Sequence, residues 1–521
     1  MAPRSSWGRR PGRVVCGWRG FLLPVLVWLT LLAGCSGLPP MPERTTSARL
    51  SPSSVTAIGR AVQADNPGDG RSGLRALSDP LDAFVARMLL VRSAEASLDI
   101  QYYIWRPDTT GLMLLDALRQ AADRGVRVRL LLDDNGIAGL DGRLAALDAH
   151  DRVEVRLFNP YPFRTAKALG YVTDFARLNR RMHNKALVAD TQAAIVGGRN
   201  IGDAYFGADP ALDFADLDVL AAGPIADDVA AAFDDYWNSA LAYPLAALVD
   251  AEPGAAPSSN DDNAAPDVNG DRYRRALRDA PLARDLAAGR LALEWVPMRL
   301  VVDPPDKAAA PPERWMAADL TEALGPVREQ VDLISPYFVP GAGGTAWLAR
   351  HPAAGVQVRV VTNSLAATDV AAVHAGYARR RVDLLRAGVR LYELKPEPGR
   401  RTGGVWPVGG SSTASLHGKT FAIDRQRVFV GSFNIDPRSL RLNTEMGLVI
   451  DSPAMAEAML KGLDAKLPLS TYALRLTGDG DIEWVEQTPA GEVVHDAEPR
   501  ASVWRRLLVT LLSWLPIEGL L

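Results

Sequence analysis

Cysteine is nearly absent from this sequence, since its 521 residues include only two. So few cysteines exclude a disulfide framework and a cysteine-based zinc site. Lysine and histidine are also rare. Of the 58 lysine and arginine residues, 7 are lysine and 51 are arginine, and the chain has 6 histidines. Because the chain uses arginine almost wherever it carries positive charge, each lysine and histidine is a candidate for a specific chemical task.

The sequence also lacks the biased amino-acid composition of a disordered, collagen-like or multi-spanning membrane protein. It is 48% apolar and 23% charged, which is typical of globular proteins. A chain of 521 residues exceeds what one hydrophobic core usually holds, which predicts two lobes or domains. The net charge of −3 becomes about −8 without the five arginines of residues 1–35. That acidic body argues against nucleic acid as the main partner.

Residues 1–35 are predicted to be a lipoprotein signal peptide. An apolar run from Phe21 to Leu32 follows a basic stretch without acidic residues and is short for a permanent membrane span. It ends in Leu-Ala-Gly-Cys, which resembles the bacterial lipoprotein signal and makes Cys35 the predicted lipidation site. We therefore expect a membrane-anchored lipoprotein of a bacterial cell envelope, on the periplasmic side, with the inner or outer membrane left open. An uncleaved N-terminal anchor is the alternative.

The C-terminal extension, residues 471–521, holds a second apolar segment. The run from Leu507 to Pro516 follows Trp504 and three arginines, Arg500, Arg505 and Arg506. Aromatic and basic residues beside an apolar run predict a segment that lies on a membrane surface. A terminal helix docked on the core is the alternative.

Low-complexity stretches divide the rest of the chain into halves. Residues 36–75 are rich in Pro, Ser, Gly and Arg and are predicted to be a tether. Residues 251–275 are predicted to be a linker. Two segments of similar size remain, 76–250 and 276–470, and each is expected to form one lobe.

The two segments repeat one order of elements. Strands alternate with helical patterns at 112–124 and 343–350, which predicts an α/β fold with largely parallel sheets. The duplication predicts a pseudo-two-fold axis between the halves. The strands are expected at 97–105, 126–132 and 153–158 in the first half, and at 331–338, 356–361 and 389–394 in the second.

Each half carries one copy of a motif, His-x-Lys-x4-Asp, with an Asn 17 residues after the His. A single His-x-Lys pair is more often a solvated strand face, but two copies with the same Asn offset are not chance. The motif residues are His183, Lys185, Asp190 and Asn200 in the first half, and His417, Lys419, Asp424 and Asn434 in the second.

The motif spacing suits the chemistry of a phosphodiester. On a strand, residues i and i+2 point to one face, so each half presents an imidazole beside an ammonium. If the pseudo-dyad brings both pairs to one pocket, the lysines and amides can hold the phosphate oxygens. One neutral histidine can attack phosphorus while the other, protonated, donates to the leaving oxygen. This division of labour requires neither a metal nor another cofactor.

An attacking histidine also needs an acid to orient its second ring nitrogen. Candidate acids follow each motif and precede an apolar run: Asp216 lies 33 residues after His183, and Glu445 lies 28 residues after His417. A loop cap is the alternative role for either acid.

The duplicated motif, with Gly-Gly-Arg-Asn at 197–200 and Gly-Ser-Phe-Asn at 431–434, resembles the phospholipase D superfamily. Longer matches at 197–206, 236–239, 362–369 and 433–439 resemble its bacterial cardiolipin synthases of the C type. The resemblance implies two α/β/α sandwich lobes with one shared active site and a covalent phosphohistidine intermediate. It implies His183 as nucleophile and His417 as acid, with Asp190 and Asp424 in structural bonds behind the site. Gly198 stands where the family usually has serine, as it does at Ser432, so the first half lacks one hydroxyl.

The resemblance and the two apolar ends favour a phosphatidyltransferase that makes cardiolipin from phosphatidylglycerol, with phosphatidylethanolamine as a further candidate donor. Aromatic residues before the motifs agree with a lipid substrate, although core packing explains them equally well. Hydrolysis to phosphatidic acid is the alternative, and a nuclease or a catalytically silent lipid-binding lipoprotein is disfavoured. The aromatic residues are Tyr161, Phe163, Tyr171, Phe175 and Trp406.

Overall fold

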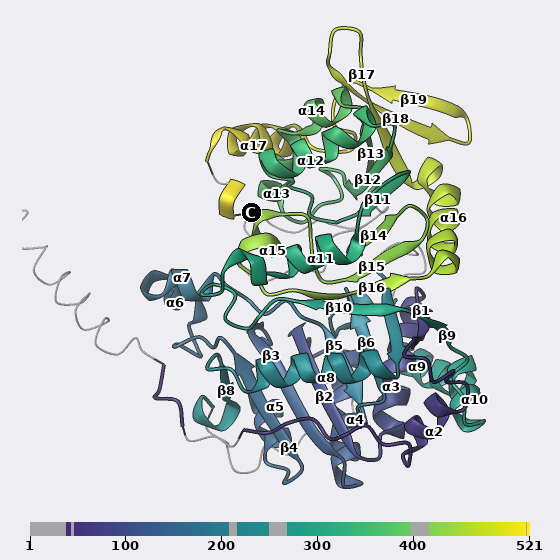
Figure 1. Ribbon diagram of the computed structural model, residues 1–521. Helices are drawn as coiled ribbons and strands as arrows, with labels where there is room; N and C mark the ends of the chain where they lie inside the picture. The colour runs from purple at the N-terminus through teal and green to yellow at the C-terminus, as the bar shows by residue number, and fades with distance from the viewer. Residues whose placement is uncertain are drawn as a thin grey trace, which may run out of the picture.

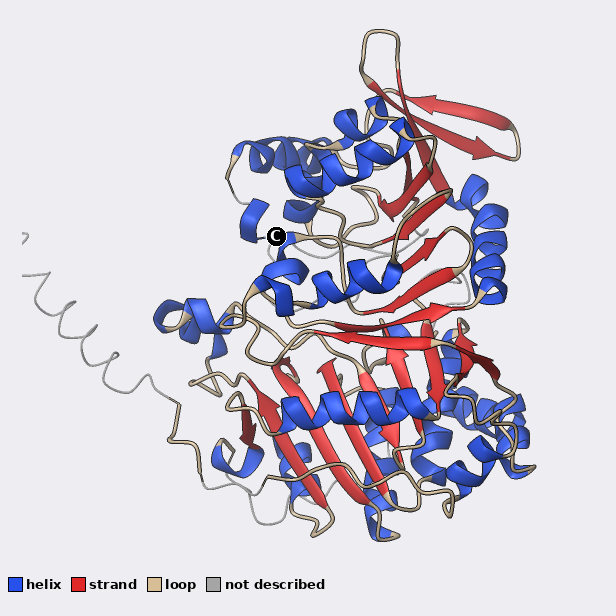
Figure 2. Ribbon diagram, viewed as in Figure 1, coloured by secondary structure: helices blue, strands red, loops and turns tan. Residues whose placement is uncertain are grey.

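Two sheet-based lobes stacked on each other make up the computed structural model (Figures 1 and 2). The structure describes residues 38–42, 46–207, 216–249, 268–396, 416–516 and 518–520. Cys35, the rest of the predicted signal peptide and Trp406 lie outside these ranges.

The first lobe is built on a nine-stranded sheet in the order β8-β4-β3-β2-β5-β6-β7-β1-β9. Strands β2, β3 and β4 pair in parallel, and the other pairs are antiparallel. The strands are β1 (Ser72–Leu77), β2 (Ser97–Ile104), β3 (Arg127–Gly136), β4 (Val153–Phe158), β5 (Ala186–Ala189), β6 (Ala193–Gly197), β7 (Asp218–Ala222), β8 (Ala242–Pro244) and β9 (Glu294–Val296).

The second lobe has a ten-stranded sheet in the order β10-β16-β15-β14-β11-β12-β13-β17-β18-β19. Its strands are β10 (Met298–Val302), β11 (Gln330–Ile334), β12 (Gln357–Asn363), β13 (Arg390–Leu394), β14 (Thr420–Ile423), β15 (Arg427–Gly431), β16 (Met446–Asp451), β17 (Thr471–Leu476), β18 (Ile482–Thr488) and β19 (Gly491–His495).

The predicted duplication is visible in the strand order. The run β4-β3-β2-β5-β6-β7 in the first sheet corresponds to β13-β12-β11-β14-β15-β16 in the second. The prediction of largely parallel sheets holds for only three strands in each sheet. The remaining pairs are antiparallel, and in each half the motif strand pairs with the next strand through a tight turn, at Asp190–Thr191 or Asp424–Arg425, where both residues have positive φ.

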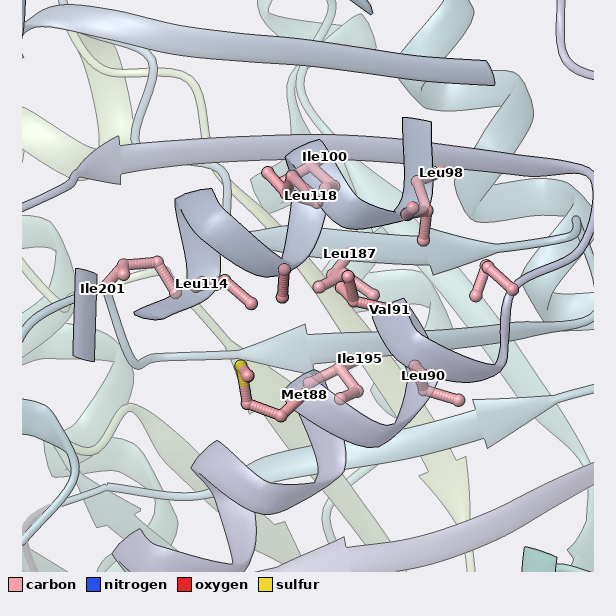
Figure 3. Close-up of a cluster of buried hydrophobic side chains, with 14 of the residues drawn as sticks. Met88, Leu90, Val91, Leu98, Ile100, Leu114, Leu118, Leu187, Ile195 and Ile201 are labelled. Carbon is pink, nitrogen blue, oxygen red and sulfur yellow. The ribbon is translucent and has the colours of Figure 1, made fainter. Parts of the chain in front are cut away.

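Helices cover both faces of each sheet, as expected for a sandwich. Figure 3 shows the core between the strands of the first sheet and two helices, where Val91, Leu114 and Leu118 meet Ile100 and Leu187. The first-lobe helices are α2 (Ala57–Gln63), α3 (Pro80–Ser93), α4 (Thr109–Asp123), α5 (Asp141–Asp148), α6 (Lys167–Thr173), α7 (Phe175–Leu178), α8 (Pro224–Trp237), α9 (Val268–Asp279) and α10 (Pro281–Ala287). The second-lobe helices are α11 (Met316–Leu324), α12 (Gly341–Ala353), α13 (Ala371–Ala378), α14 (Arg381–Arg386), α15 (Pro437–Arg441), α16 (Pro453–Ser470) and α17 (Val503–Trp514).

One apolar cluster joins the two lobes directly. Val188 and Val196 of the first sheet share it with Val430 and Leu448 of the second, and α8 and α16 contribute to it. Complete burial of such a side chain stabilises by about 1.5–3 kcal/mol. This cluster fixes the two motif-bearing halves of the sheets against each other.

The boundaries of the lobes differ from those expected. Part of the predicted tether is folded, because Ile58 and Val62 of α2 are completely buried in the first core. The second lobe begins later than residue 276, because Tyr273 and Leu277 pack in the first core and β9 pairs with β1. The chain crosses to the second sheet only between β9 and β10.

The C-terminal extension continues the second sheet and ends in α17. Val509 of α17 is buried against Leu365, Ala371 and Ala375, while Trp504 on its other side is exposed. The helix therefore docks on α13 with one face and leaves the other in solvent. Among the described residues, no helix is long and apolar enough to span a bilayer.

Candidate active site

The two motif histidines lie where the strands of one lobe reach the other. A bridge joins Met182 to Thr444, and the backbone N–H of His183 donates to the carbonyl of Thr444 over 2.9 Å. The lysines adopt the same conformation in both halves, with Nζ of Lys185 and Lys419 donating over 2.6 Å to the carbonyl of the histidine two residues earlier. The spacing of His and Lys therefore gives one local geometry twice.

The acids that orient the histidines come from opposite lobes. Nδ1 of His183 donates to Glu445 Oε2 over 2.8 Å, and Nδ1 of His417 donates to Asp216 Oδ2 over 2.7 Å. The sequence places each acid after the motif of its own half, but the structure exchanges them. The acid that orients each histidine is thus supplied by the other lobe.

The pKa values of both histidines lie below the usual range of the side chain. Burial lowers the pKa of His183 well below its usual range, and the ammonium groups of Lys185 and Lys419 lower it further. Burial and Lys419 also lower the pKa of His417, to about 4, although the carboxylate of Asp216 partly opposes them. Charges from both halves act on both histidines, which indicates one common pocket.

The lysines and acids are perturbed by the same burial. Burial lowers the pKa of Lys185 to about 7 and raises the pKa of Glu445 to about 6. Burial alone would raise the pKa of Asp216, but its hydrogen bond with His417 and nearby positive charges lower it. The buried ammonium groups lack water around them, so an anionic group that enters the pocket is attracted strongly.

Gly198 and Ser432 make the two halves chemically different. The hydroxyl of Ser432 donates to Glu445 Oε2, the same oxygen that accepts from His183. In the first half, a Cβ at Gly198 would lie only 2.1 Å from Asp216 Oδ1. Glycine therefore stands at this position because Asp216 occupies the space that a serine would need.

The asparagines also differ between the halves. Oδ1 of Asn200 accepts from the backbone N–H of Ile104 over 3.1 Å, and its amide donates to Tyr205 over 3.1 Å. Both hydrogen-bonding atoms of Asn200 already have protein partners. Oδ1 of Asn434 is buried without a hydrogen-bond partner in the structure. The protein thus holds the two asparagines differently.

Two tyrosines that the sequence did not single out lie beside the histidines. The ring of Tyr103 meets His183 edge to face at 5.0 Å, and the ring of Tyr205 meets His417 at 5.3 Å. Asn135 donates to the hydroxyl of Tyr103 over 3.0 Å and fixes that ring. The only sequence signal for Tyr205 was its place in the stretch 197–206.

Asp190 and Asp424 lie at the turns that end their motif strands, away from the histidines. Asp190 accepts backbone N–H bonds from Glu95, Ala96 and Ser97. Asp424 accepts the matching bonds at the start of β11, from residues 328–330. Both carboxylates thus tie a motif turn to the first strand of the same lobe.

His374 and the predicted aromatic residues Tyr161 and Tyr171 bond to groups other than the motif residues. His374 is buried, and its Nε2 contacts Glu498 and Arg381, so it belongs to a structural ion cluster. Tyr161 is buried and its hydroxyl bonds to that of Tyr171 over 2.8 Å, while Phe175 is half exposed. Within the described ranges, no cluster of His, Cys, Asp and Glu side chains is suited to hold a metal ion.

Two α/β/α lobes that exchange acids around a pair of His-x-Lys motifs define a phospholipase D-type protein. The family described as cardiolipin synthase, PLD-like domain matches residues 89–237 and 320–466, and the chain belongs to this family. It is 48% identical to cardiolipin synthase C of Escherichia coli over 457 residues, which cover 87% of this chain and 97% of that protein.

More distant comparisons agree with the fold. An uncharacterized protein of Helicobacter pylori is 31% identical over 84% of this chain and 88% of its own length. The crystal structure of phosphatidylserine synthase from Haemophilus influenzae matches with a TM-score of 0.51 at 15% identity, covering 80% of this chain and 92% of that one. The predictions of the family and of the duplicated fold are confirmed.

Proposed function

We propose that the protein is a phosphatidyltransferase that passes a phosphatidyl group through a phosphohistidine to phosphatidylglycerol and so makes cardiolipin. The exchanged pairing of His183 with Glu445 and of His417 with Asp216 carries this proposal. It supplies a nucleophile and an acid, each oriented at Nδ1, beside two lysines. The name of the Escherichia coli relative supports the product.

The first step transfers the phosphatidyl group to the enzyme. Nε2 of His183 attacks phosphorus, the bond to the donor's head-group oxygen breaks, and His417 gives that oxygen a proton. Lys185, Lys419 and the amide of Asn434 hold the non-bridging oxygens as charge develops. The anionic phosphodiester raises the pKa of His417 when it binds and so offsets the lowering by burial and Lys419.

The halves differ in a way that supports His183 as nucleophile. Burial and two ammonium groups bias His183 toward the neutral form, whose lone pair attacks. Asp216 raises the pKa of His417 through a hydrogen bond and its charge, which favours the proton-carrying role. Glu445 stabilises the positive charge that His183 gains on bonding to phosphorus.

The second step releases the product. His417 takes the proton of a hydroxyl of phosphatidylglycerol, whose oxygen attacks phosphorus and breaks the bond to His183. If water takes the place of that hydroxyl, the product is phosphatidic acid. Hydrolysis by the same residues is therefore the alternative reaction.

Product analysis tests the proposal. Detergent-solubilised protein is incubated with vesicles of phosphatidylglycerol and phosphatidylethanolamine in the presence of a chelator, and the lipids are resolved by mass spectrometry. Cardiolipin is the expected product, phosphatidic acid alone would favour hydrolysis, and unchanged lipid would overturn both. His183→Ala and His417→Ala should each be inactive, while His150→Ala, outside the motifs, should keep wild-type activity.

Membrane attachment through Cys35 on the periplasmic side is part of the proposal. The Leu-Ala-Gly-Cys sequence at residues 32–35 supports it. Intact-mass analysis of the membrane-extracted protein should give a chain that begins at an acylated Cys35. A mature chain that retains residues 1–34 would contradict acylation at this site.

A further inference from the structure

Exposed apolar side chains gather on two helical projections that belong to different lobes. The first projection is α6 and α7, on which Leu169, Val172 and Phe175 are exposed by 54%, 79% and 51%. The second is α17, whose exposed side carries Trp504, Leu507, Leu511 and Trp514. Large apolar side chains that lie this far out of the core mark an interaction surface.

A chain of contacts joins the two projections along one side of the molecule. Arg438 of α15 donates to the side chain and the carbonyl of Asn179 at the end of α7, over 2.9 and 2.8 Å. Arg380, at the end of α13, bonds to Glu518 of η4 (Glu518–Leu520), and Arg379 donates to the carbonyl of Leu515, just after α17. Figure 1 shows α6, α7, α15 and α17 along this same side.

Both projections are attached to segments that enter the active site. α7 ends at Leu178, five residues before His183. On the other side, Arg505 of α17 donates to the carbonyl of Thr368, and the next residue, Asp369, accepts from the hydroxyl of Tyr337 over 2.9 Å. Burial and Asp216 are the larger influences on Lys419, but the charge of Asp369 also reaches it. Both apolar projections are therefore joined to segments that lie near motif residues.

The composition of α17 fits a bilayer surface. Four of its exposed apolar residues lie at positions 504, 507, 511 and 514, which is one stripe of a helix. A tryptophan stands at each end of that stripe. Tryptophan at the edges of an apolar stripe suits the headgroup region of a membrane.

We infer that α6–α7 and α17 together form a two-pronged surface that seats on a phospholipid bilayer, with the active site between the prongs. The inference rests on the proposed function, because a phosphodiester taken from a bilayer must reach a buried pair of histidines. Contact by both prongs orients the mouth of the site toward the headgroups. This contact acts independently of an acyl group at Cys35, because the acyl group attaches the protein to the membrane without fixing its orientation.

Fluorescence from single labelled positions tests the seating directly. Full-length Val172→Cys and Trp504→Cys proteins are labelled with a polarity-sensitive dye and mixed with vesicles of phosphatidylglycerol and phosphatidylethanolamine, with the unsubstituted protein labelled as a blank. Val55→Cys, two residues before α2, is the matched control, because Val55 is 76% exposed, close to the 79% of Val172 and Trp504. Figure 1 shows α2 on the opposite side of the first lobe from α6 and α7. We expect a blue shift and quenching by spin-labelled lipid at 172 and 504 and neither at 55.

A dye that stays in a polar environment at either 172 or 504 would overturn the two-pronged surface. A shift that depends on protein concentration and not on lipid would overturn it in favour of self-association. These readouts do not require turnover, so they remain decisive even if the proposed reaction fails.

Kinetics give a second test that separates the surface from the chemistry. Val172→Glu combined with Trp504→Glu should lower turnover at limiting vesicle concentration by about tenfold per substitution, because each change removes the burial of one apolar side chain in lipid. Turnover of a short-chain phosphatidylglycerol dispersed as monomers should fall much less, and Val55→Glu should change neither. Equal losses on vesicles and monomers would contradict the surface, whereas no turnover of either lipid by the wild-type protein would contradict the proposed function.

Discussion

Replacing Glu445 by glutamine tests whether each lobe supplies the acid that orients the histidine of the other lobe. Glu445 lies 262 residues from His183 in sequence, yet its Oε2 accepts from His183 Nδ1 over 2.8 Å. The side chain is completely buried, so glutamine replaces it without loss of volume and without a new charge to bury. The substitution therefore removes the negative charge and leaves the shape of the pocket nearly unchanged.

The expected loss follows from that single hydrogen bond. A hydrogen bond to a charged group contributes about 1.5–3 kcal/mol, and about 1.36 kcal/mol changes a rate tenfold. Glu445→Gln should thus lower kcat by roughly 10- to 150-fold. The charge of Glu445 also supports the ammonium of Lys185, which favours the upper part of that range.

The pH dependence identifies the cause of the loss. Burial raises the pKa of Glu445 to about 6, and the bond from Ser432 opposes this rise. Wild-type activity should therefore fall as the pH decreases through about 6, where the carboxylate gains a proton. This acid limb should be absent in Glu445→Gln and should move to higher pH in Ser432→Ala.

The assay measures cardiolipin formation by mass spectrometry between about pH 4 and 8, which is about two units on each side of the pKa of Glu445. Glu483→Gln on β18, far from the pocket, is the matched control and should behave as wild type. Wild-type turnover and an unchanged acid limb in Glu445→Gln would refute the role of the exchanged acid.

Four further substitutions test other parts of the site. In the wild-type protein, kcat/KM for an anionic lipid should fall as the pH rises through about 7, because burial lowers the pKa of Lys185 to about 7. The pH–rate profile of Lys185→Arg should lack this fall in its residual activity, because arginine stays charged. Asp424→Asn should lower the free energy of unfolding by about 1–3 kcal/mol in denaturant titrations yet keep measurable lipid turnover, because it weakens backbone bonds behind the site. Gly198→Ser should abolish activity on vesicles, because the new Cβ would displace Asp216, whereas Ser432→Gly should retain part of it.

The family, the duplication and the four motif residues His183, Lys185, His417 and Lys419 were predictable because the spacing of a motif is local. A strand places residues i and i+2 on one face whatever surrounds it, and the structure repeats that geometry in both halves. The scarcity of lysine and histidine made these positions stand out against 51 arginines.

The exchange of acids was not predictable because it depends on how the sheets pack. Asp216 and Glu445 follow their own motifs at similar distances, so spacing alone pairs each acid with the wrong histidine. The packing of Val188 and Val196 against Val430 creates the exchange, and nothing in a strand pattern reveals which apolar faces will meet.

The folded part of the predicted tether carried a signal that composition masked. Ile58, Ala61 and Val62 have the i, i+3, i+4 spacing of one helix face, and all three are buried in the first core. The surrounding serine, proline and glycine residues dominated the composition of the stretch. A short amphipathic helix of seven residues is easily missed when a window averages over such neighbours.

The covalent intermediate tests the central claim most directly. The enzyme is mixed with phospholipid donor, quenched in alkali within one turnover and digested, and the peptides are mapped by mass spectrometry. We predict a phosphatidyl adduct on His183, abolished in His183→Ala and formed more slowly in Glu445→Gln. An adduct on another residue, or cardiolipin formed at the wild-type rate by His183→Ala, would contradict the account.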